Sequence, residues 1–123
     1  MEQKTITLPE LNDGEFYAGL ILKEDGSPDY HLIGLPGELD AAIHAQAMVW
    51  AKECGGDLPN RRELNLLRAN ARQHFQNDWY WSNEQHAAHS SYAWFQYFKD
   101  GDQGYWGKGS KLRARAVRRL SIQ

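Results

Sequence analysis

His86 and His89 are the two residues of this sequence whose type and spacing come closest to those of metal ligands. Two histidines at this spacing can share one helix face and bind zinc, but a zinc site needs about three or four ligands held by further contacts. The nearest carboxylates, on Asp78 and Glu84, do not complete any of the longer spacings typical of zinc motifs. We therefore predict a polar loop here and no bound metal or cofactor. A metal-dependent enzyme that uses His86 and His89 is the alternative.

The other residues that could do chemistry do not fall into a catalytic pattern. Ser82, Ser90 and Ser91 lack the elbow motif of a serine nucleophile. Calcium-dependent binding of a sugar would need clustered carboxylates, and the pairs Asn77-Asp78 and Asn83-Glu84 are too sparse for it. The sequence thus predicts a protein that is not an enzyme.

A cluster of basic residues without any acid lies near the end of the chain: Lys108, Lys111, Arg113, Arg115, Arg118 and Arg119. We expect a solvated strand face whose charge is neutralised by acids elsewhere in the fold. The alternative is a footprint for an anionic partner. A nucleic acid is disfavoured, because the pI is about 6.2 and the arginines fall on a single strand.

Length and composition indicate one domain, spanning residues 1–123, of an ordinary globular protein. Hydrophobic residues make up 41% of the chain and charged residues 24%. No apolar run approaches the length of a membrane span, and no signal segment opens the sequence. A single cysteine, Cys54, favours a reducing compartment, so we expect a cytoplasmic protein without membrane contact.

The first part of the chain, residues 1–36, predicts an N-terminal hairpin. A short strand is expected at 4–8, and two longer strands at 16–22 and 30–35 are separated by a turn at 25–28. An unprotected edge of this hairpin invites pairing with a second copy, which leaves a homodimer open.

Residues 37–74 predict two helices. In the first, apolar residues recur at helical spacing from Ile43 to Cys54, which places Cys54 on the buried face, and Gly55-Gly56 ends the helix. The second begins with Asn60 and Glu63 at the spacing of a capping box and fades near residue 74.

Residues 75–120 hold most of the aromatic residues and predict an antiparallel sheet. Asp100-Gly101 follows the aromatic run at 92–98 and is a strong hairpin signal. The alternation at 112–117 predicts one last strand with Leu112, Ala114 and Ala116 directed inward.

Four segments in this order resemble one known family. They are LPNRREL at 58–64, YWS at 80–82, AWFQYF at 93–98 followed by Asp100-Gly101, and Lys108 followed by ARAVR at 114–118. They are similar to the LPTrxEL, YWSS, AW…F.DG and K…VRCVR segments of the domain at the C-terminus of Legionella-type collagen-like adhesins, which also occurs as a stand-alone phage or prophage protein. Gly56-Asp57 and Ala116 depart from the family pattern. The sequence contains no collagen-like repeat, which favours the free-standing type.

The resemblance implies a C-type-lectin-like fold of the formylglycine-generating-enzyme subtype, with two helices packed on an antiparallel sheet. It places Trp81, Trp94 and Phe98 in the core. It also makes Arg115 and Arg118 structural residues, for which we expect Glu63 or Asp57 as a partner. The copper oxidase chemistry of this fold uses a cysteine pair, which a single cysteine cannot supply.

The function that we predict is a non-enzymatic binding module, phage- or prophage-encoded, that presents loops of the C-terminal half to a protein or glycan. The alternative is an intracellular phage factor that inhibits or modulates a host complex. The residues expected to meet the ligand share polar tips and sit in these loops or on exposed strand faces: Tyr80, Asn83, Gln85, His86, His89, Tyr97, Tyr105 and Lys108.

Overall fold

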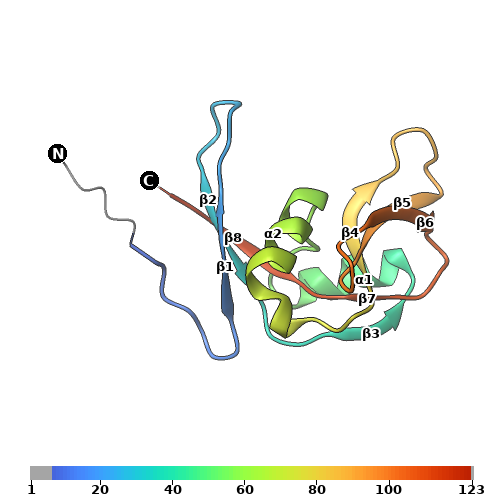
Figure 1. Ribbon diagram of the computed structural model, residues 1–123, viewed down its shortest axis with the longest axis horizontal. Helices are drawn as coiled ribbons and strands as arrows, with labels where there is room; N and C mark the ends of the chain where they lie inside the picture. Colours follow the sequence, from blue (N-terminus) through green and yellow to red (C-terminus); the bar gives the residue numbers. More distant parts are fainter. Residues whose placement is uncertain (1–6, 123) are drawn as a thin grey trace.

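The computed structural model describes residues 7–122, which form two helices and two β-sheets (Figure 1). The first sheet has the strand order β1-β2-β8, with β1 at Phe16–Ile21, β2 at Tyr30–Gly34 and β8 at Val117–Ser121. The second has the order β3-β7-β4-β5-β6, with β3 at Leu39–Ala42, β7 at Leu112–Ala114, β4 at Trp79–Gln85, β5 at Tyr92–Tyr97 and β6 at Gln103–Gly107. The helices are α1 at His44–Glu53 and α2 at Arg61–Ala71, followed by a 3-10 turn, η1, at Arg72–His74. The predicted α+β class is confirmed, although β4 and β7 pair in parallel where the sequence predicts only antiparallel strands.

The predicted N-terminal hairpin is confirmed, and its second strand is also the centre of the first sheet. β1 pairs antiparallel with β2, with Phe16 opposite Gly34, and β8 pairs with the other side of β2, with Val117 opposite the same glycine. Only glycine fits at position 34, because the Phe16 ring occupies the space that a Cβ would need. The strand predicted at residues 4–8 begins outside the described residues, and its last two residues are not in a strand.

Both predicted helices are present, with the expected signals at their ends. Gly55, just beyond α1, has a φ of 90°, the left-handed conformation in which helices commonly end. At the start of α2, the Asn60 side chain accepts a hydrogen bond from the Glu63 backbone N–H, at 2.8 Å. The Glu63 carboxylate in turn accepts from the Asn60 N–H, also at 2.8 Å, which completes the predicted capping box.

The prediction that Cys54 is a buried residue of the first helix is wrong. The buried side chains of α1 are those of His44, Ala47 and Ala51, whereas Cys54 lies just past the last helical residue and is exposed. The helical period does not continue to Cys54, because the chain turns away at Gly55.

The single strand predicted at 112–117 is two strands that belong to different sheets. β7 ends at Ala114, and β8 begins at Val117. Leu112, Ala114 and Ala116 are buried as predicted. β3, which pairs antiparallel with β7, is not predicted by the sequence.

Two hydrophobic cores lie on opposite faces of the five-stranded sheet. Helix α2 lies between the two sheets and helix α1 covers the other face of the larger sheet (Figure 1). The core beside α2 consists of Phe16, Ala18, Leu32, Leu64, Leu67, Ala71, Tyr80, Phe98 and Val117. The core beside α1 consists of Leu35, Ala47, Ala51, Leu58, Trp81, Ala93, Leu112, Ala114 and Ala116. Strand β4 therefore contributes to a core on each of its faces.

The predicted core positions of Trp81 and Phe98 are confirmed, because both side chains are fully buried. Trp94 is only partly buried, so its predicted place in the core is wrong. Within residues 7–122, no helix combines the length and the apolar character needed to cross a membrane.

Candidate functional site

Aromatic side chains gather where the loop after β4 meets the hairpin of β5 and β6. Tyr92 and Trp94 lie two residues apart on β5, and Tyr105 on β6 pairs directly with Trp94, so these three side chains share one face of the sheet. His86 and His89 come from the loop that joins β4 to β5. Trp106 follows Tyr105 on the edge strand β6, so its side chain points to the other face of the sheet, toward Trp79, but both residues line one hollow at this edge. We call these residues the aromatic surface: His86, His89, Tyr92, Trp94, Tyr105 and Trp106.

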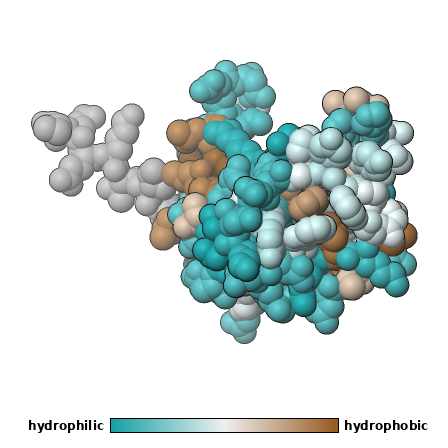
Figure 2. Space-filling view, turned by 45° about the vertical axis from the view of Figure 1, so that its right-hand side comes forward, coloured by the Kyte–Doolittle hydropathy of each residue, from teal (hydrophilic) through white to brown (hydrophobic). Residues whose placement is uncertain are grey.

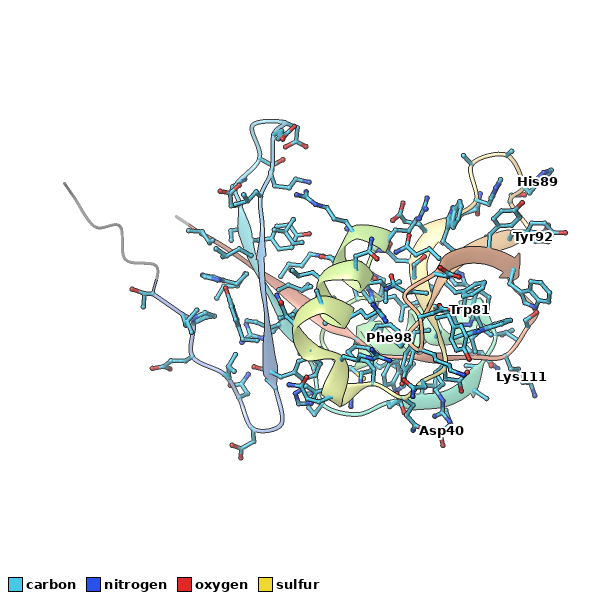
Figure 3. The ribbon with its side chains drawn as sticks, in the orientation of Figure 1. Asp40, Trp81, His89, Tyr92, Phe98 and Lys111 are labelled. Atoms are coloured by element: carbon cyan, nitrogen blue, oxygen red, sulfur yellow. The ribbon has the colours of Figure 1, made fainter. Side chains whose placement is uncertain are left out.

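His86 is at the centre of the aromatic surface. Its ring centroid lies 4.3 Å from that of Tyr105, 5.5 Å from that of Trp94 and 5.3 Å from that of His89. The rings of Tyr92 and Tyr105 are stacked at 5.8 Å. Figure 3 shows His89 and Tyr92 together at the outer end of the β4–β5 loop, far from the buried Trp81 and Phe98. The structure thus brings together His86, His89 and Tyr105, three of the predicted ligand-binding residues.

Backbone hydrogen bonds fix the loop that carries the two histidines. The N–H of His86 donates to the Tyr92 carbonyl at 2.9 Å, and the N–H of Tyr92 donates to the His89 carbonyl at 3.0 Å. The Nδ1 atom of His86 accepts a further hydrogen bond from the Ala88 N–H at 3.1 Å. The loop backbone and the His86 ring are therefore held against the sheet.

Arg61, the first residue of α2, packs against one ring of the aromatic surface and forms hydrogen bonds with neighbouring strands. Its guanidinium lies 3.5 Å from the centre of the Trp94 ring, a cation–π contact. Its Nε donates to the Gln103 side chain at 2.9 Å, and the amide of Gln103 donates back to the Arg61 carbonyl at 2.7 Å. The Arg61 N–H donates to the carboxylate of Glu84 at 2.6 Å. These contacts join α2 to strands β4, β5 and β6.

Replacing Arg61 by methionine should lower the free energy of unfolding by about 1–2 kcal/mol, because the cation–π contact and one side-chain hydrogen bond are lost. Urea denaturation followed by tryptophan fluorescence would measure the change. Arg62→Met is the matched control, since the exposed Arg62 makes one hydrogen bond, to the Leu22 carbonyl. Equal losses in the two variants would show that Arg61 does not support this face.

A hollow of about 390 Å³ lies at the edge of the aromatic surface, lined by Tyr92, Tyr105, Trp106, Gly107 and Ser110. The three aromatic residues are 38%, 45% and 51% exposed, which is high for such large rings. Figure 2 shows residues of intermediate hydropathy, in pale tones, on the side of the molecule that carries β4 to β6. No charged residue is among those that line the hollow.

Three of the six basic residues near the chain end, Arg113, Arg118 and Arg119, are paired with acids, as predicted. The Arg113 guanidinium forms ion pairs with three carboxylates, at nitrogen–oxygen distances of 2.7 Å to Asp78, 3.2 Å to Asp40 and 3.3 Å to Glu38. Arg118 contacts Glu15 at 3.0 Å. The hydrogen bond from Arg118 holds the pKa of Glu15 below its ordinary value. Lys108 donates to the Gln85 side chain at 2.7 Å, so these two predicted ligand-binding residues pair with each other.

Arg115 and Arg118 make structural contacts as predicted, but their predicted partners are wrong. Arg115 donates to the Leu35 carbonyl at 3.2 Å, and Arg118 binds Glu15. The carboxylates of Glu63 and Asp57 are bound instead by the next arginine in the sequence, Arg119. The nitrogen–oxygen distances are 2.6 Å to Glu63 and 3.0 Å to Asp57.

Three predicted ligand-binding residues lie away from the aromatic surface. Tyr80 is only 1% exposed and its hydroxyl donates to Glu38, so its assignment to an exposed face is wrong. Asn83 donates its side-chain N–H to Asp57 at 3.0 Å, which gives it a structural contact. The Tyr97 ring packs edge-on against the Trp79 ring, with 6.0 Å between the ring centroids. Tyr97 lies on the face of β5 opposite to Tyr92 and Trp94, and it is not among the residues that line the hollow.

Sequence reasoning missed Tyr92, Trp94, Trp106 and Arg61 as members of this region. The signal for the first three was the Asp100-Gly101 turn, which sets which residues of β5 and β6 face each other. Arg61 gave no signal of its own, because its contacts are with residues 23 or more positions away that only the fold brings near.

No group of three or more histidine, cysteine, aspartate or glutamate side chains within residues 7–122 is arranged to hold a metal ion. No protein-family model matches the chain, and a search of curated proteins finds no significant match.

Proposed function

We propose that this protein is a non-enzymatic binding module whose aromatic surface meets a protein or a glycan. The observation that carries the proposal is the exposure of Tyr92, Tyr105 and Trp106 around a shared hollow. Tyrosine and tryptophan supply large contact areas at a low cost in conformational entropy, and they dominate the energetics of many interfaces.

The rigidity of the aromatic surface supports a role in recognition. The histidine loop is held by backbone hydrogen bonds to β5, and Trp94 is held between Arg61 and its neighbours on the sheet. A surface that is already ordered before the ligand arrives loses less entropy on binding than a mobile one.

The buried ionisable side chains have structural contacts, which supports a module without catalysis. Glu63 is bound by Arg119 and Tyr30. The Nε2 atom of His44 lies 2.8 Å from the Ser82 carbonyl oxygen, and burial lowers the pKa of this histidine.

The same proposal includes a C-type-lectin-like scaffold of the formylglycine-generating-enzyme subtype. It is supported by two helices packed on β-sheet and by the pairing of the N-terminal hairpin with the last strand. In this arrangement the loops of β4, β5 and β6 lie at the end of the molecule opposite the sheet of β1, β2 and β8 (Figure 1).

The proposal is tested by selecting ligands from a random peptide library and from an oligosaccharide array. The double variant Tyr105→Ala/Trp106→Ala should bind every selected ligand at least tenfold more weakly, because truncation of such anchors typically costs about 2 kcal/mol or more. Tyr97→Ala is the matched control, since it removes a ring of β5 that does not line the hollow and should leave binding unchanged. Ligands that bind the double variant as well as the wild type would rule out this surface.

A further inference from the structure

We infer that the hollow formed by Tyr92, Tyr105, Trp106, Gly107 and Ser110 binds an uncharged carbohydrate. This inference rests on the proposed binding function and narrows its ligand to one chemical class. It is argued from the size of the hollow, from the groups that line it and from the charges around it.

The size of the hollow suits a small ring rather than a protein surface. Its volume of about 390 Å³ lies in the range of about 300–1,000 Å³ that is typical of sites for small molecules. The space above Gly107 is open, because an added Cβ there would have only the Ser110 hydroxyl within 4 Å. A ligand can therefore approach the backbone of β6 as well as the aromatic rings.

The lining combines the two kinds of contact that a sugar needs. The faces of aromatic rings carry partial negative charge, which attracts the weakly positive C–H groups on the flat side of a pyranose. The hydroxyls of Tyr92, Tyr105 and Ser110 and the indole N–H of Trp106 can exchange hydrogen bonds with sugar hydroxyls. Rings with polar tips around one hollow thus match a ligand that has an apolar face and a polar edge.

The lining of the hollow, which includes no charged residue, favours an uncharged ligand over a polyanion. Single-stranded nucleic acid is bound by grooves in which aromatic rings alternate with cations that follow the phosphates. Here Lys108 is bound to Gln85, and Arg61 is held by Trp94 and Gln103. Lys111 follows Ser110 in the sequence but is not part of the lining.

The test is a titration of the ¹⁵N-labelled protein, followed by two-dimensional NMR, with cellohexaose, maltohexaose, chitohexaose and mannohexaose as neutral probes. At least one should shift the Trp106 indole signal and the backbone signals of Tyr92 and Tyr105. Trp106→Ala should weaken that probe at least tenfold, while Tyr97→Ala should not. Because Trp106 is half exposed, the variant is expected to keep its dispersed spectrum.

Two further probes separate the failure of this inference from the failure of the proposed function. If only a heparin hexasaccharide, oligo(dT) or a library-selected peptide shifts these signals, the ligand is not an uncharged sugar but the binding module stands. If no oligosaccharide, nucleic acid or library peptide shifts them, both proposals are overturned.

Discussion

Replacing Arg119 by methionine is expected to lower the free energy of unfolding by about 3–5 kcal/mol, because it leaves a buried carboxylate without its counter-charge. That carboxylate belongs to Glu63, which is fully buried in the structure. Arg119 binds it through two hydrogen bonds of 2.6 and 2.8 Å, and Tyr30 donates a third of 2.7 Å. Burial and this contact raise the pKa of Tyr30 to about 12, so the tyrosine remains a neutral donor at physiological pH.

Chemical denaturation of the purified variant measures the expected loss. Arg62→Met is again the control for removing an arginine from the surface, and surface changes of this kind usually stay within about 0.5 kcal/mol. A second variant, Arg119→Met/Glu63→Gln, should recover part of the lost stability, because a neutral amide needs no counter-charge. If the double variant were less stable than Arg119→Met alone, buried charge would not be the cause of the loss.

The same arginine makes the stability depend on pH in acid. Burial alone would raise the pKa of Asp57, but hydrogen bonds from Arg119 and Asn83 hold it below its ordinary value. A carboxylate whose pKa is lowered by folding stabilises the protein above its unfolded pKa, about 3.9 for aspartate, and this contribution is lost as the pH falls through the folded value. Below pH of about 4, the unfolding free energy of the wild type should therefore fall more steeply than that of Arg119→Met.

Replacing Trp81 by alanine is expected to lower the free energy of unfolding by about 3–5 kcal/mol. Its side chain is fully buried in the core beside α1, 5.0 Å edge-on from the His44 ring. Its indole N–H donates to the Ala42 carbonyl at 2.9 Å, which holds β3 against β4. The variant loses both the packed ring and this hydrogen bond.

Trp106→Ala is the matched control, because it removes the same side chain from a position that is 51% exposed. Its only aromatic contact among the described residues is edge-on with Trp79, so a loss of at most about 1 kcal/mol is expected. Thermal unfolding followed by circular dichroism compares the two variants. Similar losses at positions 81 and 106 would contradict the assignment of one to the core and the other to the surface.

The sequence predicts those parts of the fold well whose conformation is set by neighbouring residues in the chain. The capping box at Asn60, the helix end at Gly55 and the Asp100-Gly101 hairpin are all in place. Each is set by backbone geometry within a few residues, which is why the sequence is sufficient to find it.

The alternation of residues along β4 does not predict which of its side chains are exposed, because this strand has a core on both faces. Tyr80 belongs to the core beside α2 and Trp81 to the core beside α1, so neither is exposed. A pattern of period two distinguishes the two faces of a strand but cannot show whether both are covered. The prediction of an exposed Tyr80 in the candidate site is wrong for this reason, whereas the wrong core position of Trp94, on β5, follows from the family resemblance.

The arginine partners could not be predicted because they depend on where the last strand begins. The sequence reads as one strand at 112–117, but residues 115 and 116 leave the sheet and β8 restarts at Val117. In β8, Arg119 lies opposite Leu32 on the face toward α2, while Arg118 lies opposite Ile33 on the other face. A shift of one residue exchanges the two faces, and with them the acids that each arginine can reach.

Because β8 completes the sheet begun by β1 and β2, this sheet depends on residues from opposite ends of the sequence. A nascent chain leaving the ribosome can form the β1–β2 hairpin and α2 early, but β2 lacks one hydrogen-bonded neighbour until Val117–Ser121 has emerged. The pairing of β2 with β8 joins residues far apart in the sequence, and closing so long a loop slows folding, so this sheet is completed only when β8 is added. Until then, Leu32 and Ile33 stay unprotected on an open strand, and that interval is when this chain is most exposed to aggregation.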